Sequence, residues 1–171
     1  MKPEKRKWST RDIAELGVMI AALEAGKLAL SSLPNVEIVT FLLIMFTLTF
    51  GWKSIVAAFA FVGVECLIWP IQLWVFMYLY IWPLLVLLTM LFRKQSSIWF
   101  WSIFSGLYGL CFGGLCSIVY IFTSGIHTAV TWWIAGIPFD LVHGISNFFV
   151  MLLLYLPMHK VFQRYRRTRE D

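Results

Sequence analysis

Hydrophobic residues in this chain gather into six long segments, separated by short groups of polar residues, glycine or proline. The segments cover residues 12–33, 36–50, 54–69, 71–92, 98–122 and 139–156. A helix needs about 20 residues to cross a bilayer, with a range of about 17–25. The pattern therefore predicts an all-α integral membrane protein, a six-transmembrane-helix bundle. The second and third segments are short, so we expect one helix there to be broken or to cover only part of the bilayer.

The last segment carries polar residues at helical spacing. We expect a loop at residues 123–131, then an entry ramp, with Pro138 in the first helical turn, where its missing N–H is tolerated. Asp140, His143, Gly144 and Asn147 follow at i, i+3, i+4 and i+7, so they share one face of the predicted helix. Such groups are expensive in lipid, which indicates that they face a cavity or a partner rather than hydrocarbon. The alternative is that they are polar contacts between packed helices.

Composition supports a single membrane domain covering residues 1–171. The chain is 60% hydrophobic and only 13% charged, against about 25% charged in soluble domains. We divide it into a basic N-terminus (1–10), the bundle (11–158) and a basic C-terminal tail (159–171). Its three cysteines lie in apolar segments without metal-ligand spacing, so we expect no disulfide framework and no zinc site.

Basic residues give the predicted orientation. With six crossings, all 14 Lys and Arg residues except Lys27 fall on one side of the membrane. The positive-inside rule then places both termini in the cytoplasm of a multi-pass cell-membrane protein. The N-terminus resembles the basic start of a signal peptide, but Asp12, Glu15 and Glu24 interrupt the apolar run after it, so we expect no cleavage.

In this orientation the remaining ionisable residues of several helices lie at one depth, in the outer half of the bilayer. They are Glu24, Lys27, Glu37, Glu65, Asp140 and His143. One explanation is an interfacial aromatic belt with isolated charge pairs, in which Glu24 and Lys27 neutralise each other. The other is an outward-facing pocket with a few convergent polar groups. We favour the pocket, because a belt does not require so many buried acids.

Two segments carry small residues at every fourth position, which lets helix backbones approach closely. They are Gly17, Ala21, Ala25 and Ala29 in the first segment, and Ser105, Gly109, Gly113 and Ser117 in the fifth. We expect the fifth-segment stripe to pack inside the chain. The first-segment stripe is a candidate contact for a separate membrane subunit.

Motifs for a soluble ATPase or hydrolase are absent from the sequence. Asp140 and His143 could act as an acid–base pair or as two metal ligands, with His127 or Glu65 as the third. An intramembrane enzyme using Asp140 and His143 is therefore the alternative from a different class. We expect a binding protein, not an enzyme, with no cofactor or metal.

Four stretches resemble a known family. They are AALEAGKLALSSLPNVEIVTFLLIMFTLTFG, YIWPLL, FSGLYGLCFGGLCSIVY and WWIAGIPFDLVHGISNF. Together they are similar to the S components of energy-coupling factor (ECF) vitamin transporters, most closely those for cobalamin, over about residues 11–157. The resemblance implies a high-affinity vitamin-binding subunit of an ABC importer, with six helices, cytoplasmic termini and an outward-facing site. S components dock on a transmembrane coupling subunit and two ATPase subunits, and topple to release the substrate inward.

The resemblance also suggests residue roles. An A-x-x-x-A pattern in the first helix meets the coupling subunit in this family, and Ala21, Ala25 and Ala29 supply it here. The substrate-binding candidates are Asn35, Glu37, Gln72, Trp74, Trp133, Asp140, His143 and Asn147. Cobalamin is the first choice of ligand. Another vitamin or precursor, such as pantothenate or a queuosine precursor, is the alternative within the family.

Overall fold

The computed structural model describes residues 8–170, so most of the predicted basic N-terminus lies outside the described residues. The described part of the chain is all-α. Its six helices are α1 (Thr10–Ala29), α2 (Val39–Phe50), α3 (Lys53–Ile68), α4 (Leu73–Leu91), α5 (Ile98–Ser124) and α6 (Ile126–Glu170). Each coincides with one of the six apolar segments, as the hydrophobic pattern predicts.

Three of these helices, α4, α5 and α6, are long and apolar enough to cross a membrane, whereas α2 is apolar but shorter. The surface also suits lipid, since Leu67, Leu91, Phe122 and Leu153 each expose at least 70% of their area. Large apolar side chains exposed to this extent on α3, α4, α5 and α6 suit an apolar environment. The structure therefore supports a helical membrane protein, while six crossings and the sides of the termini stay predictions.

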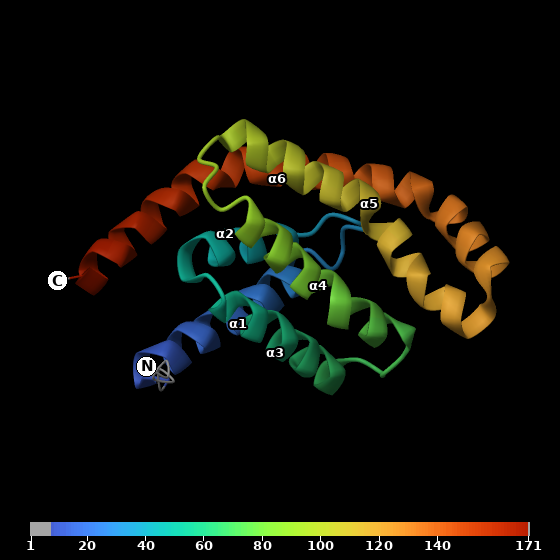
Figure 1. Cartoon of the computed structure of the whole chain (residues 1–171), viewed down its shortest axis with the longest axis horizontal. Coiled ribbons are helices and arrows are strands. Elements are labelled where there is room, and N and C mark those ends of the chain that lie inside the picture. The colour runs from blue at the N-terminus through green and yellow to red at the C-terminus, as the bar shows by residue number, and fades with distance from the viewer. Residues whose placement is uncertain (1–7, 171) are drawn as a thin grey trace, which may run out of the picture.

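The helices alternate in direction along the bundle (Figure 1). α5 and α6 form a long antiparallel hairpin over one side of the molecule, and α1 to α4 pack beneath it. The start of α1 and the end of α6 lie at the same end, which we call the termini end. The connections α1–α2, α3–α4 and α5–α6 lie toward the other end. The arrangement brings loop 30–38 next to the middle of α6.

α2 forms the centre of the bundle. Its residues Val39–Thr47 are all buried, and it packs against α1, α3, α4 and α6. With 12 residues it is about 18 Å long, shorter than the hydrocarbon core, as expected for this segment. Charged side chains bind the unpaired backbone groups at both ends of α2. Glu37 accepts a hydrogen bond from the Thr40 backbone N–H, and Arg166 donates to the carbonyls of Leu48 and Thr49. These charges complement the helix dipole at both ends.

A buried ionic cluster fixes α1 at the termini end. Ser9 and Asp12 form a capping box that begins the helix. Lys53, the first residue of α3, makes ion pairs with both Asp12 and Glu15. Tyr165 of α6 donates a 2.6 Å hydrogen bond to Glu15. The cluster joins three helices, and the sequence analysis did not anticipate it.

The expected loop at residues 123–131 is wrong. α5 ends at Ser124 and α6 already begins at Ile126, then continues to Glu170 with Pro138 and Pro157 inside it. The hydroxyls of Thr128 and Thr131 donate to carbonyls four residues earlier, so these polar residues are compatible with the helix. Pro138 is therefore an interior residue, and its missing N–H is tolerated mid-helix rather than at a first turn.

Candidate functional site

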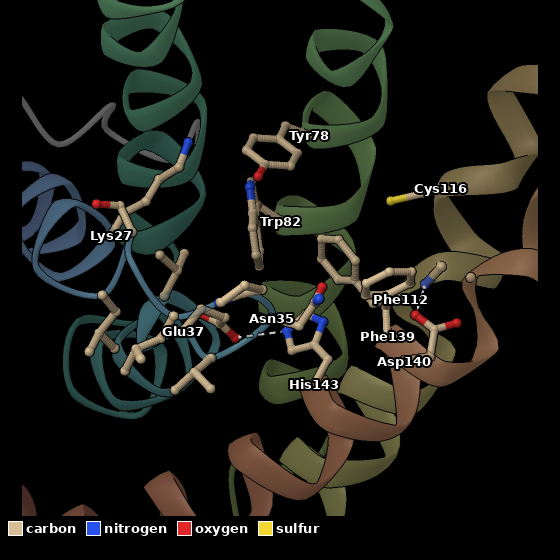
Figure 2. A pocket seen from close by; sticks show the side chains of 18 of the residues that line it. Lys27, Asn35, Glu37, Tyr78, Trp82, Phe112, Cys116, Phe139, Asp140 and His143 are labelled. Carbon is tan, nitrogen blue, oxygen red and sulfur yellow. Dashed lines mark hydrogen bonds and ion pairs between the residues drawn. The ribbon is translucent and has the colours of Figure 1, made fainter.

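A cavity of ≈ 510 Å³ lies between loop 30–38, α4, α5 and α6 (Figure 2). We call it the main cavity. Four of the predicted site residues line it, namely Asn35, Glu37, Asp140 and His143. They come from two parts of the chain more than a hundred residues apart, and the packing of the loop against α6 brings them together.

Glu37 and His143 form the polar centre of the main cavity. His143 Nε2 lies 3.2 Å from Glu37 Oε1, and the Thr40 backbone N–H donates to Glu37 Oε2 at 2.8 Å. Burial raises the pKa of Glu37, but the hydrogen bonds from His143 and Thr40 outweigh it, and the pKa lies below its ordinary value. An ionised Glu37 can only accept hydrogen bonds, so His143 donates through Nε2 whenever this carboxylate is ionised.

Asp140 is held against α5 on the far side of the same cavity. Its Oδ1 accepts a 2.9 Å hydrogen bond from the Gly113 backbone N–H. A Cβ added at Gly113 would lie 2.4 Å from Asp140 Oδ2, so glycine is what admits the carboxylate here. Oδ2 is buried without a hydrogen-bond partner. A buried carboxylate oxygen left unpaired is costly, and a donor supplied by a ligand would satisfy it.

The loop that carries Glu37 is tied to α6. Ser146 donates a hydrogen bond of 3.1 Å to the carbonyl of Asn35. Asn35 has a φ of 58°, a left-handed conformation that asparagine tolerates better than most residues. The turn at Asn35 directs the following residues back over the cavity, so both Asn35 and Glu37 reach its wall.

A row of aromatic rings borders the main cavity; Tyr78, Trp82, Phe112 and His143 line it, and Trp74 continues the row outside it. The row runs Trp74–Tyr78–Trp82–Phe112–His143, with centroid separations of 5.4, 5.3, 5.5 and 4.8 Å. Tilted and edge-to-face pairs of this kind are favourable. Of these residues the sequence analysis named only Trp74 and His143 as site candidates, and it missed Tyr78, Trp82 and Phe112, which line the main cavity. The i, i+4, i+8 spacing of Trp74, Tyr78 and Trp82 is the signal that could have found this face of α4.

The other four predicted site residues lie outside the main cavity. Gln72 and Trp74 line two other cavities, of ≈ 690 and ≈ 300 Å³, near the α3–α4 connection. Trp133 lies against Gly114 and is 44% exposed, while its neighbour Trp132 lines the main cavity instead. Adjacent helical residues point about 100° apart, so choosing the wrong tryptophan selects the wrong face.

Asn147 does not line the main cavity either. It is 1% exposed, and its Nδ2 has no hydrogen-bond partner. Asn147 lies seven residues after Asp140 on the same face of α6, which is about 10 Å farther along the helix. The shared face was predicted correctly, but the cavity ends before it reaches Asn147.

The Glu24–Lys27 pair of the alternative explanation is not what the structure shows either. Lys27 instead makes an ion pair with Glu65 of α3. Both carboxylate oxygens of Glu24 are buried and lack a hydrogen-bond partner. Spacing along one helix favours the i, i+3 pair, but α1 packs against α3 and brings a second acid within reach of the lysine.

Asp140 and His143, the residues of the intramembrane-enzyme alternative, make hydrogen bonds to different partners. Asp140 is bonded to Gly113 and His143 to Glu37. Among the described residues, no group of three His, Cys, Asp or Glu side chains could hold a metal ion. A metal centre completed by His127 or Glu65 is therefore not formed there.

Comparisons with family models, with characterised proteins and with solved structures give no match to this chain.

Proposed function

We propose that this protein is the S component of an ECF-type importer, which binds a vitamin from the outer side of the cell membrane. The observation that carries the proposal is the ≈ 510 Å³ main cavity, lined by Glu37, Asp140 and His143 together with aromatic rings. Its volume and mixed lining are those of small-molecule sites. The loop 30–38 that lines the cavity lies away from the termini end (Figure 1), where the basic residues gather, so this side would face outward if the termini are cytoplasmic.

Cobalamin is the ligand that the sequence resemblance implies. The volume of the main cavity favours a second candidate, a smaller vitamin or precursor such as pantothenate or a queuosine precursor. A corrin macrocycle with its nucleotide tail is larger than the drug-sized molecules that cavities of about 300–1,000 Å³ enclose. Cobalamin binding would therefore require the loop and α6 to separate.

The proposal includes partners: a transmembrane coupling subunit and two ATPase subunits. The described part of the chain has no domain that could hydrolyse ATP, so active uptake would need other subunits. Ala21, Ala25 and Ala29 are all exposed on α1, which keeps them available for a helix of the coupling subunit. In this proposal the protein binds and releases its ligand unchanged and is not an enzyme.

The test of function is to identify the small molecule that co-purifies with the protein. We expect a vitamin or precursor, bound with one molecule per chain, and calorimetric titration with cobalamin, pantothenate and a queuosine precursor would rank the candidates. Recovery of a chemically altered product after incubation with the bound molecule would contradict the proposal and favour the enzyme alternative.

The orientation has a separate test in a cysteine-free background. We expect a cysteine at Gly125 to react with a membrane-impermeant thiol reagent on intact cells, and a cysteine at Gln95 to stay unlabelled until the cells are opened. If the cysteine at position 95 is labelled on intact cells and the cysteine at position 125 is not, the main cavity lies on the cytoplasmic side, which contradicts uptake from outside.

A further inference from the structure

Lys27 is surrounded by groups that stabilise a positive charge. Its Nζ contacts the Glu65 carboxylate and lies 5.5, 5.9 and 6.0 Å from the ring centroids of Tyr78, Trp74 and Phe61. We call these four residues, Glu65, Phe61, Trp74 and Tyr78, the ammonium cage. An aromatic cage closed by a carboxylate is the arrangement with which proteins bind ammonium ligands. Here the cage is filled by the protein's own lysine.

Two buried carboxyl groups, those of Glu65 and Glu24, lie near the single ammonium group of Lys27. Glu65 is fully buried and bonds the lysine through Oε2, which leaves Oε1 buried without a partner. Glu24, one turn before Lys27 on α1, is 9% exposed and has no partner for either oxygen. One ammonium group thus serves two buried carboxylates. A buried carboxylate needs a compensating proton or cation, so a second positive charge would be accommodated here.

There is also space for a ligand beside the cage. A second cavity of ≈ 300 Å³ is lined by Glu65, Trp74, Tyr78 and Lys27, among others. Lys27 and Tyr78 also line the main cavity, so these two side chains stand between the two spaces. Figure 2 shows Lys27 and Tyr78 near each other at one edge of the main cavity. A molecule in the main cavity could therefore reach the cage by displacing the lysine head group.

We propose that the ammonium cage binds the cationic nitrogen of a small-molecule ligand, and that Lys27 moves from Glu65 to Glu24 when the ligand binds. Each carboxylate then has one cation: Glu65 pairs with the ligand, and Glu24 pairs with Lys27 at i, i+3 on the same helix. The aromatic rings face the incoming ammonium group as they face Lys27 now. The inference deepens the proposed function: it assigns a positive charge to the imported molecule and so disfavours the anionic pantothenate among the candidate ligands.

The opposite role, in which Lys27 receives an anionic ligand, fits the charges less well. An anion at Lys27 would lie close to Glu65 and Glu24, and would share the main cavity with Glu37 and Asp140. Like charges in a site of low dielectric repel strongly. The two roles also predict opposite effects when the lysine is removed, which makes them separable by experiment.

The probe is choline, compared with dimethylbutanol, its neutral carbon isostere. Equilibrium dialysis of radiolabelled choline against the purified full-length protein in neutral detergent should show saturable binding that dimethylbutanol does not compete. Lys27→Met should bind choline roughly tenfold more tightly, because the internal competitor for the cage is gone. The matched control is Lys94→Met, an exposed lysine outside the helices, which should bind choline as the unmodified protein does.

Three results would overturn the inference: equal competition by dimethylbutanol, loss of choline binding in Lys27→Met, or unchanged binding in Glu65→Gln. If these buried variants do not fold, Trp74→Leu replaces them, since Trp74 is only half-buried. It should weaken choline binding roughly tenfold, whereas Trp99→Leu, at an exposed tryptophan of α5, should not. Choline binding needs neither the vitamin nor the coupling subunit. A vitamin that binds while choline does not would therefore reject the cage and leave the transport proposal standing.

Discussion

Two stripes of small residues with the same four-residue spacing have opposite surroundings in this structure. Ser105, Gly109, Gly113 and Ser117 of α5 are all buried, whereas Gly17, Ala21, Ala25 and Ala29 of α1 are all exposed. A Cβ added at Gly109 would lie 2.9 Å from the backbone of Gly144 on α6, but one added at Gly17 would meet nothing within 4 Å. The spacing permits close approach; whether a neighbour uses it depends on the rest of the bundle.

The difference follows from what each helix offers on its other faces. α5 and α6 are joined by one residue, Gly125, so the stripe on α5 meets the glycine of its immediate neighbour in the chain. α1 is held to the bundle by its opposite face, where Asp12 and Glu15 pair with Lys53 and where Met19 and Leu23 are buried in the core. Its small residues consequently point away from the bundle. The stripe on α5 helps to build the site, whereas the stripe on α1 stays exposed.

The largest effect is expected from removing the attachment of α1. Lys53→Met leaves Asp12 and Glu15 buried without their cation, and breaking a buried ion pair typically costs about 3–5 kcal/mol. We expect a loss of that size in the free energy of unfolding, measured by reversible denaturation in mixed detergent micelles. Lys94→Met, at an exposed lysine with no ion pair among the described residues, should change it little. An unchanged free energy of unfolding in Lys53→Met would show that α1 is held by its apolar contacts instead.

The same measurement compares the two stripes directly through one substitution at two glycines. Gly109→Ala should destabilise by about 1–3 kcal/mol, because backbone atoms of α6 cannot move aside as a flexible side chain could. Gly17→Ala should stabilise by about 0.5–1 kcal/mol, because alanine is the better helix former and has room. Equal effects at both positions would mean that α5 and α6 are not packed closely at Gly109 in solution.

How much the sequence could predict differs between the fold and the site. Apolar segments report helices well, because lipid or a core must cover every apolar face, and all six were found. Segment ends were less certain: the threonines at 128 and 131 are typical of a loop, yet their hydroxyls bond within α6. The helical spacing of Asp140 and His143 predicted a shared face, which the structure has.

Contacts between helices were harder to predict. Nothing in the spacing of Glu24 and Lys27 shows that Glu65 of α3 takes the lysine. Similarly, Trp82 and Phe112 lie among many aromatic residues, and only the packing of α4 against α5 brings them into one wall. Choosing Trp133 rather than Trp132 depended on the rotation of α6 about its axis, which the apolar pattern of a lipid-facing helix does not determine.

The exposed stripe on α1 should matter for assembly and not for folding. Ala25→Leu places a bulky side chain where a neighbouring helix would approach, so we expect about tenfold weaker association with the coupling subunit. Stability and ligand affinity of the isolated protein should be unchanged. The measurement is co-purification of the ATPase subunits, with Ala135→Leu at an exposed position of α6 as the control. Full assembly of Ala25→Leu would mean that the stripe faces lipid.

The smallest effect is expected at Asn147, the residue of the shared α6 face that lies beyond the cavity. From sequence alone, Asn147→Leu is predicted to weaken ligand binding, because an amide on the face of Asp140 and His143 would contact the ligand. In the structure the amide is buried below the main cavity and its Nδ2 has no partner. Replacing an unpaired buried amide by an apolar group of similar size is nearly neutral or stabilising. We therefore expect ligand affinity to stay within about twofold and stability to change by less than about 1 kcal/mol.

Asp140→Leu supplies the contrast on the same face, because it leaves the Gly113 N–H without its acceptor and removes a carboxylate from the cavity wall. A tenfold or greater loss of affinity in Asn147→Leu would extend the site one helical turn deeper into the bundle than the cavity reaches.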